Sequence, residues 1–294
     1  MGEGRARPLA QRLSGRRVGV ALSAGYFGFF GHAGFLQALD DAGIAVSCWA
    51  GTSAGALVGA MAASGMKGTE VVERLGRVQR RDFWDPDPLG VLAAGLGGYG
   101  ATGLLAGLKL RRLLERELPA RFEDLRSPCV VVATNLSRNA PQAFDRGELP
   151  AVVHASCAYP GMFRAAEVGG ELFWDGGLLD KAPVLALHRS QRPEVILVHY
   201  LPSRSSSGSE GAAPTGWGAW PKAMAAAMGA LRQDHFRLQV DQLRQAGIEV
   251  VVVETDLPAL GPTKLAEGAR VAQLARRKVS ETLANFFTEP SRDG

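Results

Sequence analysis

The chain has 294 residues, of which 46% are hydrophobic and 21% are charged, and its formal net charge is +4. A chain of this length and apolar content can bury a large core, and α/β folds of this size often form one domain. Its three isolated cysteines, Cys48, Cys129 and Cys157, have no metal-like spacing. This excludes a cysteine-based metal site and indicates reduced core residues of a cytoplasmic protein.

The first 17 residues hold much of the positive charge. Glu3 alone offsets five arginines there, which are Arg5, Arg7, Arg12, Arg16 and Arg17. We expect a flexible, solvated basic arm over residues 1–17 and a single domain over residues 18–290. No nucleic-acid motif follows the arm, so nucleic acid is not expected as a partner. The segment imitates a signal peptide but has no convincing cleavage site, so secretion is not expected.

The predicted elements alternate from the first strand onward. Apolar residues 18–23 predict a strand, residues 24–34 a glycine-rich loop, and residues 32–42 an amphipathic helix. A mostly apolar run at residues 46–50 predicts the next strand, and the small residues 54–63 favour a helix after it. Strand, loop, helix, strand and helix in this order indicate a parallel α/β fold.

Between the second strand and its helix lies G-T-S-A-G, from Gly51 to Gly55, with Ser53 at its centre. A strand, a sharp turn and a helix around G-x-S-x-G form the setting of a nucleophile elbow. Small residues must flank the serine so that strand and helix can approach, and the serine lies beside the positive end of the helix dipole. The pattern alone fits a simple tight turn equally well.

The rest of the chain continues the alternation. Its periodicity predicts four helices, over residues 109–118, 149–157, 222–246 and 264–287. It predicts four strands, over residues 129–133, 172–174, 195–200 and 249–254. Residues 203–218 are rich in Ser, Gly, Ala and Pro, which indicates a loose loop within the domain.

Two stretches are candidates for contact with lipid. Residues 89–108 are uncharged but contain seven glycines, each of which costs a helix up to about 1 kcal/mol, so a flap fits better than a membrane-spanning helix. Trp217 and Trp220 flank the loose loop, and such aromatic residues favour the interface between water and lipid. Either both stretches pack on the core, or the protein is cytoplasmic and binds transiently at the periphery of a membrane.

A serine hydroxyl needs a base within hydrogen-bond reach to act as a nucleophile. The order Ser-Asp-His would require a histidine on a late loop, and the chain after His235 has none, which argues against an ordinary triad. Asp175 ends a short apolar strand and precedes Gly176 and Gly177. This pattern is typical of a carboxylate presented on a tight turn at a sheet edge, where ligands collect, although it also fits a plain Asx turn.

Several motifs together resemble the patatin-like phospholipase family in order and spacing. They are V-A-L-S-A-G-Y-F-G-F-F-G-H-A-G-F-L-Q-A-L-D-D-A-G-I, G-T-S-A-G, V-V-A-T-N-L, A-S-C-A-Y-P-G-M-F and W-D-G-G-L-L-D-K-A-P-V, all within residues 18–198. The resemblance implies a three-layer α/β catalytic domain with a central, mostly parallel sheet between helices. It implies a lipid ester as substrate, no metal and no cofactor, and a catalytic dyad in which Ser53 is the nucleophile and Asp175 the base.

The glycine-rich loop departs from the family pattern. The family's three consecutive glycines fall on Ala24, Gly25 and Tyr26, and its usual Arg or Lys falls on Gly28. Backbone N–H groups need no particular side chain, so we expect an oxyanion hole built from Gly25, Tyr26 and Gly28. Arg164 either replaces the missing cation in contacting a head group or faces solvent.

These observations lead to the expectation of a lipid acyl hydrolase, of phospholipase A or lysophospholipase type, that works through an acyl-enzyme. A general esterase or an acyl transferase would use the same dyad. A catalytically weak lipid-binding protein could keep the same fold after its glycine-rich loop had lost the oxyanion geometry.

Overall fold

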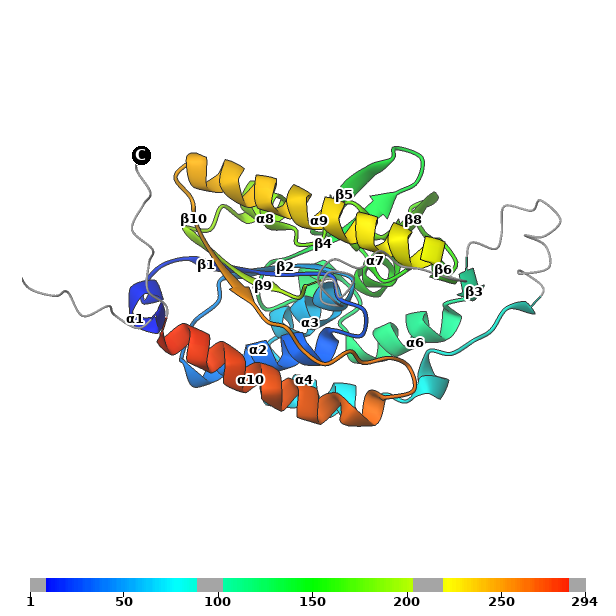
Figure 1. Ribbon diagram of the computed structural model, residues 1–294, viewed down its shortest axis with the longest axis horizontal. Helices are drawn as coiled ribbons and strands as arrows, with labels where there is room; N and C mark the ends of the chain where they lie inside the picture. The colour runs from blue at the N-terminus through cyan, green and yellow to red at the C-terminus, as the bar shows by residue number, and fades with distance from the viewer. Residues whose placement is uncertain (1–8, 89–102, 203–218, 286–294) are drawn as a thin grey trace, which may run out of the picture.

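The computed structural model describes residues 9–88, 103–202 and 219–285 (Figure 1). Most of the predicted flap, residues 89–102, lies outside the described residues. So do the predicted loop at residues 203–218, which includes Trp217, and the side chain of Trp220. Within the described ranges, no helix combines the length and the apolar sequence that a membrane crossing requires.

An eight-stranded sheet forms the middle of the described structure, in the order β10-β9-β1-β2-β4-β8-β7, with β5 paired to β4. The first five strands of this order are parallel, whereas β5, β8 and β7 are antiparallel to their neighbours. The strands are β1 (Val18–Leu22), β2 (Cys48–Thr52), β4 (Cys129–Asn135), β5 (Ala140–Phe144), β7 (Ala166–Val168), β8 (Glu171–Asp175), β9 (Val195–Tyr200) and β10 (Glu249–Glu254). A separate parallel pair consists of β3 (Gly103–Leu105) and β6 (Gly161–Phe163).

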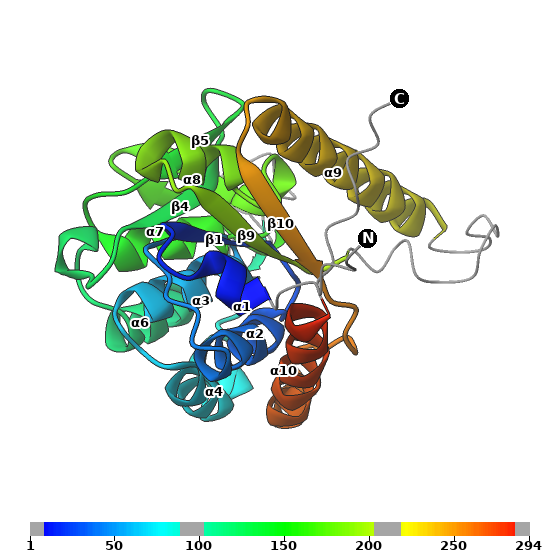
Figure 2. The same ribbon diagram turned by 90° about the vertical axis from the view of Figure 1, so that its left-hand side faces the viewer.

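Helices cover both faces of the sheet, which gives three layers (Figure 2). One helical layer contains α1 (Leu9–Leu13), α2 (Phe29–Asp41), α3 (Ala54–Ala63), α4 (Gly68–Gly76), α6 (Leu108–Glu117), α7 (Leu149–Ser156) and α10 (Gly268–Ala284). The other contains α8 (Val184–Gln191) and α9 (Ala219–Gln245). The predicted fold, a central and mostly parallel sheet between helices, is confirmed.

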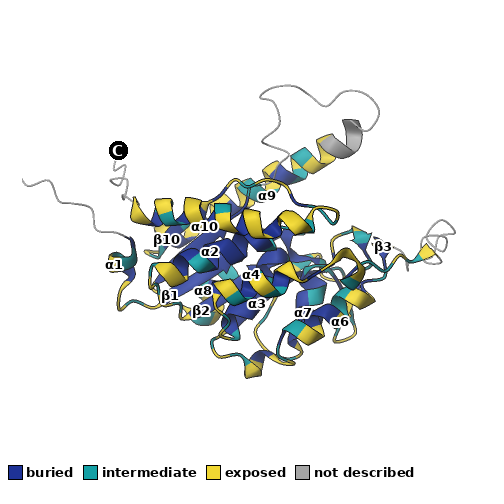
Figure 3. Ribbon diagram, turned by 90° about the horizontal axis from the view of Figure 1, so that it is seen from below, coloured by how far each residue is buried: buried dark blue, intermediate teal, exposed yellow. Residues whose placement is uncertain are grey.

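Alternate residues of the central strands supply two cores. On β9, Val195 and Leu197 pack with the layer of α2 and α10, while Ile196 and Val198 pack with the layer of α8 and α9. Side chains of a strand alternate between the two faces of a sheet, so a strand covered on both faces is apolar throughout. Figure 3 shows the consequence, with buried strands behind helices whose outer faces are exposed.

The ends of several elements differ from the prediction. α2 begins at Phe29 rather than at residue 32, which shortens the glycine-rich loop to residues 23–28. β2 continues to Thr52 and therefore takes two residues of the G-x-S-x-G motif into the sheet. The helices α4 and α8 and the strand β5 were not predicted.

Residues 9–17 correct the expectation of a flexible arm. α1 buries Leu9 and Leu13, whose spacing of four residues places them on one helical face, and it contacts α10. Arg12 and Arg16 pair with the carboxylate of Glu249 at 2.9 and 2.5 Å. Apolar burial and ion pairing thus attach this segment to the domain, and residues 1–8 lie outside the described part.

Gly34 makes the contact between α2 and α10 possible. A Cβ atom at Gly34 would lie 2.1 Å from the carbonyl oxygen of Ala272, and a backbone atom cannot move aside cheaply. We predict that Gly34→Ala lowers the free energy of unfolding by about 1–3 kcal/mol, because it forces the two helices apart. Denaturant unfolding measures this effect.

Gly76→Ala is the matched control. Gly76 is also a helical glycine, at the last position of α4, but a Cβ atom there meets nothing within 4 Å. Alanine at this exposed position should leave stability unchanged or raise it by up to about 1 kcal/mol. Equal effects of the two substitutions would contradict the packing argument.

Candidate active site

Ser53 forms the sharp turn between β2 and α3. Its φ of 55° and ψ of −120° lie in a region that residues other than glycine rarely adopt. Neighbouring elements hold this backbone in place. The N–H of Ser53 donates to Oγ of Ser156 at 2.8 Å, and the Ser156 hydroxyl donates to the carbonyl oxygen of Val132 at 2.6 Å. The turn expected for a nucleophile elbow is therefore present, and α7 and β4 fix it.

The two glycines of the motif have no room for side chains. A Cβ atom on Gly51 would lie 2.2 Å from the carbonyl oxygen of Gly55, and a Cβ atom on Gly55 would lie 2.2 Å from that of Leu22. Any side chain at either position would push α3 away from β1 and β2. The close approach of strand and helix predicted from the motif is what the structure contains.

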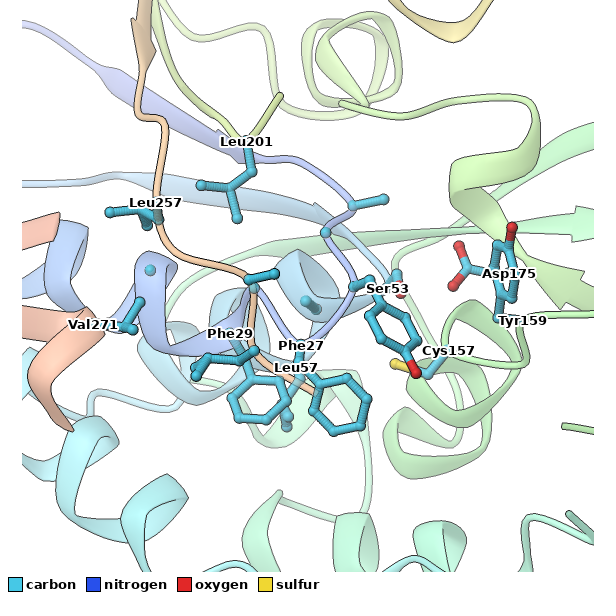
Figure 4. A pocket seen from close by; sticks show the side chains of 18 of the residues that line it. Phe27, Phe29, Ser53, Leu57, Cys157, Tyr159, Asp175, Leu201, Leu257 and Val271 are labelled. Atoms are coloured by element: carbon cyan, nitrogen blue, oxygen red, sulfur yellow. The ribbon is translucent and has the colours of Figure 1, made fainter. Parts of the chain in front are cut away.

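Asp175 ends β8 with its carboxylate pointing toward Ser53 (Figure 4). Its N–H donates to the carbonyl oxygen of Ala158 at 2.9 Å, and its own carbonyl oxygen accepts from Oγ1 of Thr134 at 2.9 Å. Oδ1 accepts from the N–H of Gly177 at 2.7 Å, and the Ser53 hydroxyl lies close enough to the carboxylate to stabilise its charge. The structure thus brings the two residues singled out from the sequence together at one cavity.

The Asp-Gly-Gly turn is attached to the opposite helical layer. Gly176 and Gly177 begin a short 3-10 turn, residues 176–178. The carbonyl oxygen of Gly177 accepts a hydrogen bond from Nη1 of Arg232, on α9, at 3.2 Å. Sequence reasoning missed Arg232, because nothing in a long polar helix indicates which arginine points at a distant turn.

Burial raises the pKa of Asp175 to about 6. Desolvation is the largest effect, since the residue is only 4% exposed. The nearby Ser53 hydroxyl, the hydrogen bond from Gly177 and the charge of Arg232 oppose it by stabilising the carboxylate. Asp175 is therefore ionised at neutral pH and becomes protonated just below it.

The glycine-rich loop, residues 23–28, supplies backbone donors beside Ser53. The N–H of Gly28 donates to the carbonyl oxygen of Gly25 at 2.9 Å and is therefore not available to a substrate oxyanion. This contradicts the expectation that Gly28 belongs to the oxyanion hole. The N–H groups of Gly25, Tyr26 and Ala54 have no acceptor in the part of the chain that the structure describes, and all three residues line the cavity. Sequence reasoning missed Ala54, although the residue after the nucleophile commonly donates its N–H in such elbows.

Ser53 and Asp175 open into a mostly apolar cavity of about 580 Å³. A volume of this order, between about 300 and 1,000 Å³, is typical of sites for small molecules. The apolar walls come from the glycine-rich loop and α3 on one side and from the segments after β9 and β10 on the other (Figure 4). Prominent among them are Phe27, Phe29, Leu57, Leu201, Leu257 and Val271.

None of the five histidines lines this cavity. His32 and His199 are buried against each other, with their Nδ1 atoms 2.8 Å apart, and burial lowers the pKa of His32 to about 4. Arg164 does not line the cavity either, because its guanidinium forms an ion pair with Asp87. The substitute cation proposed from the sequence is therefore not found at Arg164.

The three cysteines are free thiols. Cys48 and Cys129 are buried in the sheet, and burial raises the pKa of each, to about 11 and about 12. Cys157 lines the cavity beside Ser53, and burial raises its pKa as well, so the thiol stays protonated. Over the described ranges, no cluster of three or more His, Cys, Asp or Glu side chains could hold a metal ion.

Comparison with known proteins identifies the family. The sequence profile described as patatin-like phospholipase matches residues 20–188, more than half of the chain. The chain belongs to the patatin-like phospholipase family. An uncharacterised protein of the NTE family from Mycobacterium tuberculosis is 33% identical over 181 residues, which cover 60% of this chain and 48% of that protein. This chain thus spans about half the length of that relative.

Two more distant proteins are also similar to this chain. The lysophospholipase NTE1 of Cryptococcus neoformans is 26% identical over 191 residues, 65% of this chain and 12% of that protein. Among solved structures, VipD from Legionella pneumophila aligns with a TM-score of 0.46 and 16% identity, over 91% of this chain and 67% of that chain.

Ser156 offers a direct test of how the elbow is held. Ser156→Ala removes the acceptor of the Ser53 N–H and the donor to Val132. We predict a loss of about 1–3 kcal/mol in the free energy of unfolding, because buried polar groups lose their partners. Ser64→Ala, at the half-buried C-terminal end of α3, is the control, because it removes only a local hydrogen bond to the carbonyl oxygen of Met61 and should cost less than about 1 kcal/mol. A loss of the same size in both variants would show that Ser156 does not hold the elbow.

Proposed function

We propose that this chain is a lipid acyl hydrolase that cleaves carboxylic esters through a Ser53–Asp175 dyad. The observation that carries the proposal is that a serine on a strained elbow and a buried carboxylate face each other at an apolar cavity. Membership of the patatin-like phospholipase family supports a lipid ester as the substrate.

The reaction proceeds through an acyl-enzyme. Asp175 accepts the proton of Ser53 while Oγ attacks the ester carbonyl, and the N–H groups of Gly25, Tyr26 and Ala54 stabilise the oxyanion that forms. The proton passes to the departing alcohol as the ester bond breaks. A water molecule then gives a proton to Asp175 and attacks the acyl-enzyme, and Asp175 passes that proton to Oγ of Ser53 as the bond to the acyl group breaks and the fatty acid is released.

Phospholipid or lysophospholipid is the favoured substrate class, supported by the family and by the name of the fungal relative, a lysophospholipase. A general esterase or an acyl transferase would use the same groups with a different substrate or acceptor. In a lipid-binding protein without activity, Ser53 would not be activated. A fluorophosphonate probe separates these classes, because it labels only an activated serine.

Transient docking on a membrane remains part of the proposal. Leu104 and Leu108, in the described end of the glycine-rich stretch, are 59% and 63% exposed. Tyr26, at the rim of the cavity, is 64% exposed. Apolar and aromatic side chains of this kind favour a lipid interface.

Ser53→Ala tests the nucleophile. We predict that ester hydrolysis falls to the background rate and that fluorophosphonate labelling disappears, because the attacking oxygen is gone. Thermal unfolding should resemble that of the wild type, since alanine is as small as serine at this turn. Turnover that survives the substitution would reject Ser53 as the nucleophile.

Asp175→Asn tests the base. Loss of a general base should lower kcat by at least about 10²-fold, whereas His235→Gln, on the exposed surface of α9, should not. In the wild type, kcat/KM should rise with pH through an apparent pKa of about 6, because only the ionised carboxylate accepts the serine proton. An indispensable histidine, or a rate that does not fall below pH 6, would contradict the dyad.

A further inference from the structure

Two fully buried histidines lie beside the glycine-rich loop, His32 on α2 and His199 on β9. Nε2 of His32 lies 2.8 Å from the carbonyl oxygen of Ser23, the first residue of the loop, and Nδ1 of His32 lies 2.8 Å from Nδ1 of His199. Nε2 of His199 lies 3.2 Å from Oγ1 of Thr255, a residue after β10 that lines the cavity. A continuous chain of polar contacts therefore runs from the cavity wall to the loop.

The carbonyl oxygen of Ser23 fixes the proton positions along this chain. A carbonyl oxygen only accepts, so Nε2 of His32 carries a hydrogen, and in a neutral ring Nδ1 of His32 is then an acceptor. Nδ1 of His199 donates to it, which leaves Nε2 of His199 to accept from the Thr255 hydroxyl. Burial lowers the pKa of both rings, that of His32 to about 4, so both are neutral at pH 7. Each donor thus has one acceptor, and the chain is directed toward Ser23.

Ser23 is held at three of its atoms. Besides the contact at its carbonyl oxygen, its N–H donates to the carbonyl oxygen of His199 at 3.1 Å, and its Oγ accepts from the N–H of Leu201 at 2.9 Å. The side chain of Leu201 packs on the loop, since a Cβ atom on Gly25 or Gly28 would lie 2.9 or 2.5 Å from its Cδ1. The loop is therefore anchored where it leaves β1, two residues before Gly25, whose N–H is the first donor of the proposed oxyanion hole.

Apolar packing alone does not account for the histidine pair. Phe35 stacks on the ring of His199, with the ring centroids 4.4 Å apart, so the surroundings are those of a core. Apolar side chains would fill this space without removing polar atoms from water. Four ring nitrogens are buried here instead, and each of them has a partner. The specific result is a fixed position for the carbonyl oxygen of Ser23.

We propose that His32 and His199 are positioning residues for the oxyanion hole. The pair holds the carbonyl oxygen of Ser23, and the loop that follows then presents the N–H groups of Gly25 and Tyr26 to the ester carbonyl. This inference rests on the proposed hydrolase function. Neither imidazole lines the cavity, so both act through the loop and not on the serine proton. A displacement of about 1 Å at a reacting centre can lower a rate about 10²-fold, so a small shift of the loop is sufficient.

His32→Phe and His32→Gln test this role with a soluble ester, p-nitrophenyl butyrate. Phenylalanine keeps a ring but removes both nitrogens, so kcat should fall at least about tenfold, because the oxyanion loses aligned donors. KM should stay within about twofold, since the oxyanion exists only beyond the ground state. The amide of glutamine can still donate to the carbonyl oxygen of Ser23, so His32→Gln should lose less activity. The apparent pKa of about 6 in kcat/KM should not change, because Asp175 remains the base.

Phe35→Leu is the control variant. It removes packing from the same His199 ring but none of the hydrogen bonds, so it should lower Tm and leave kcat within about twofold of the wild type. Losses of kcat that follow the losses of Tm equally in Phe35→Leu and His32→Phe would show that the pair is only structural and would overturn the proposal. Turnover of His32→Phe at the background rate, or a shifted pH profile, would give an imidazole a role in proton transfer and would overturn it as well.

Nitrogen-15 spectra of the imidazole rings separate this inference from the hydrolase function, because they need no substrate. In the wild type at pH 7, His32 should be the Nε2–H tautomer and His199 the Nδ1–H tautomer, with the signals assigned by their loss in His32→Gln. The opposite tautomer, or a protonated ring, would overturn the proposal.

Hydrogen exchange reads the loop itself if the wild type hydrolyses no ester and the proposed function therefore fails. The amide hydrogens of Ser23 and Leu201 should then exchange at least about tenfold faster in His32→Phe than in Phe35→Leu, because their hydrogen bonds depend on the anchored loop. Equal exchange rates in the two variants would show that the pair does not position the loop.

Discussion

The contact between backbones at the elbow is the constraint on which the site depends. Gly51, Gly55 and Leu22 bring β1, β2 and the start of α3 within van der Waals contact, so the chain must turn sharply at Ser53. That turn leaves the serine with strained dihedral angles, which cost about 1–3 kcal/mol and persist only where surrounding structure fixes them. The hydrogen bond to Ser156 and the packed cores on both faces of the sheet provide that support.

The register of the sheet explains why Ser53 meets Asp175. β4 lies between β2 and β8, with Thr52 of β2 opposite Val132 and Asp175 of β8 opposite Ala133. The two strands run in opposite directions, yet they end at the same level along β4. A longer β8 would carry its carboxylate past the elbow, so the early end of this strand is as important to the site as the motif around Ser53.

The sequence predicted those parts of the site that local chemistry determines. Gly51 to Gly55 need close packing, and Asp175 needs a turn, so both leave a pattern in adjacent residues. Prediction from local sequence fails at Gly28. The turn that uses the N–H of Gly28 depends on where α2 begins, and the ends of helices are weakly encoded in the sequence. Such prediction fails more clearly at Arg232, because the hydrogen bond from Arg232 to Gly177 depends on how α9 packs over the sheet. Likewise, α1 depends on a partner, Glu249, that is distant in the sequence.

An apolar cavity favours lipid and at the same time penalises the charges that the chemistry needs. Desolvation disfavours the carboxylate of Asp175 and the ammonium of Lys181 alike, which moves both pKa values toward neutrality, to about 6 and about 7. Arg232 acts on the two groups in opposite ways, because its charge stabilises the carboxylate and destabilises the ammonium. The ionised state of the base in one layer of the fold therefore depends in part on an arginine that the opposite helical layer supplies.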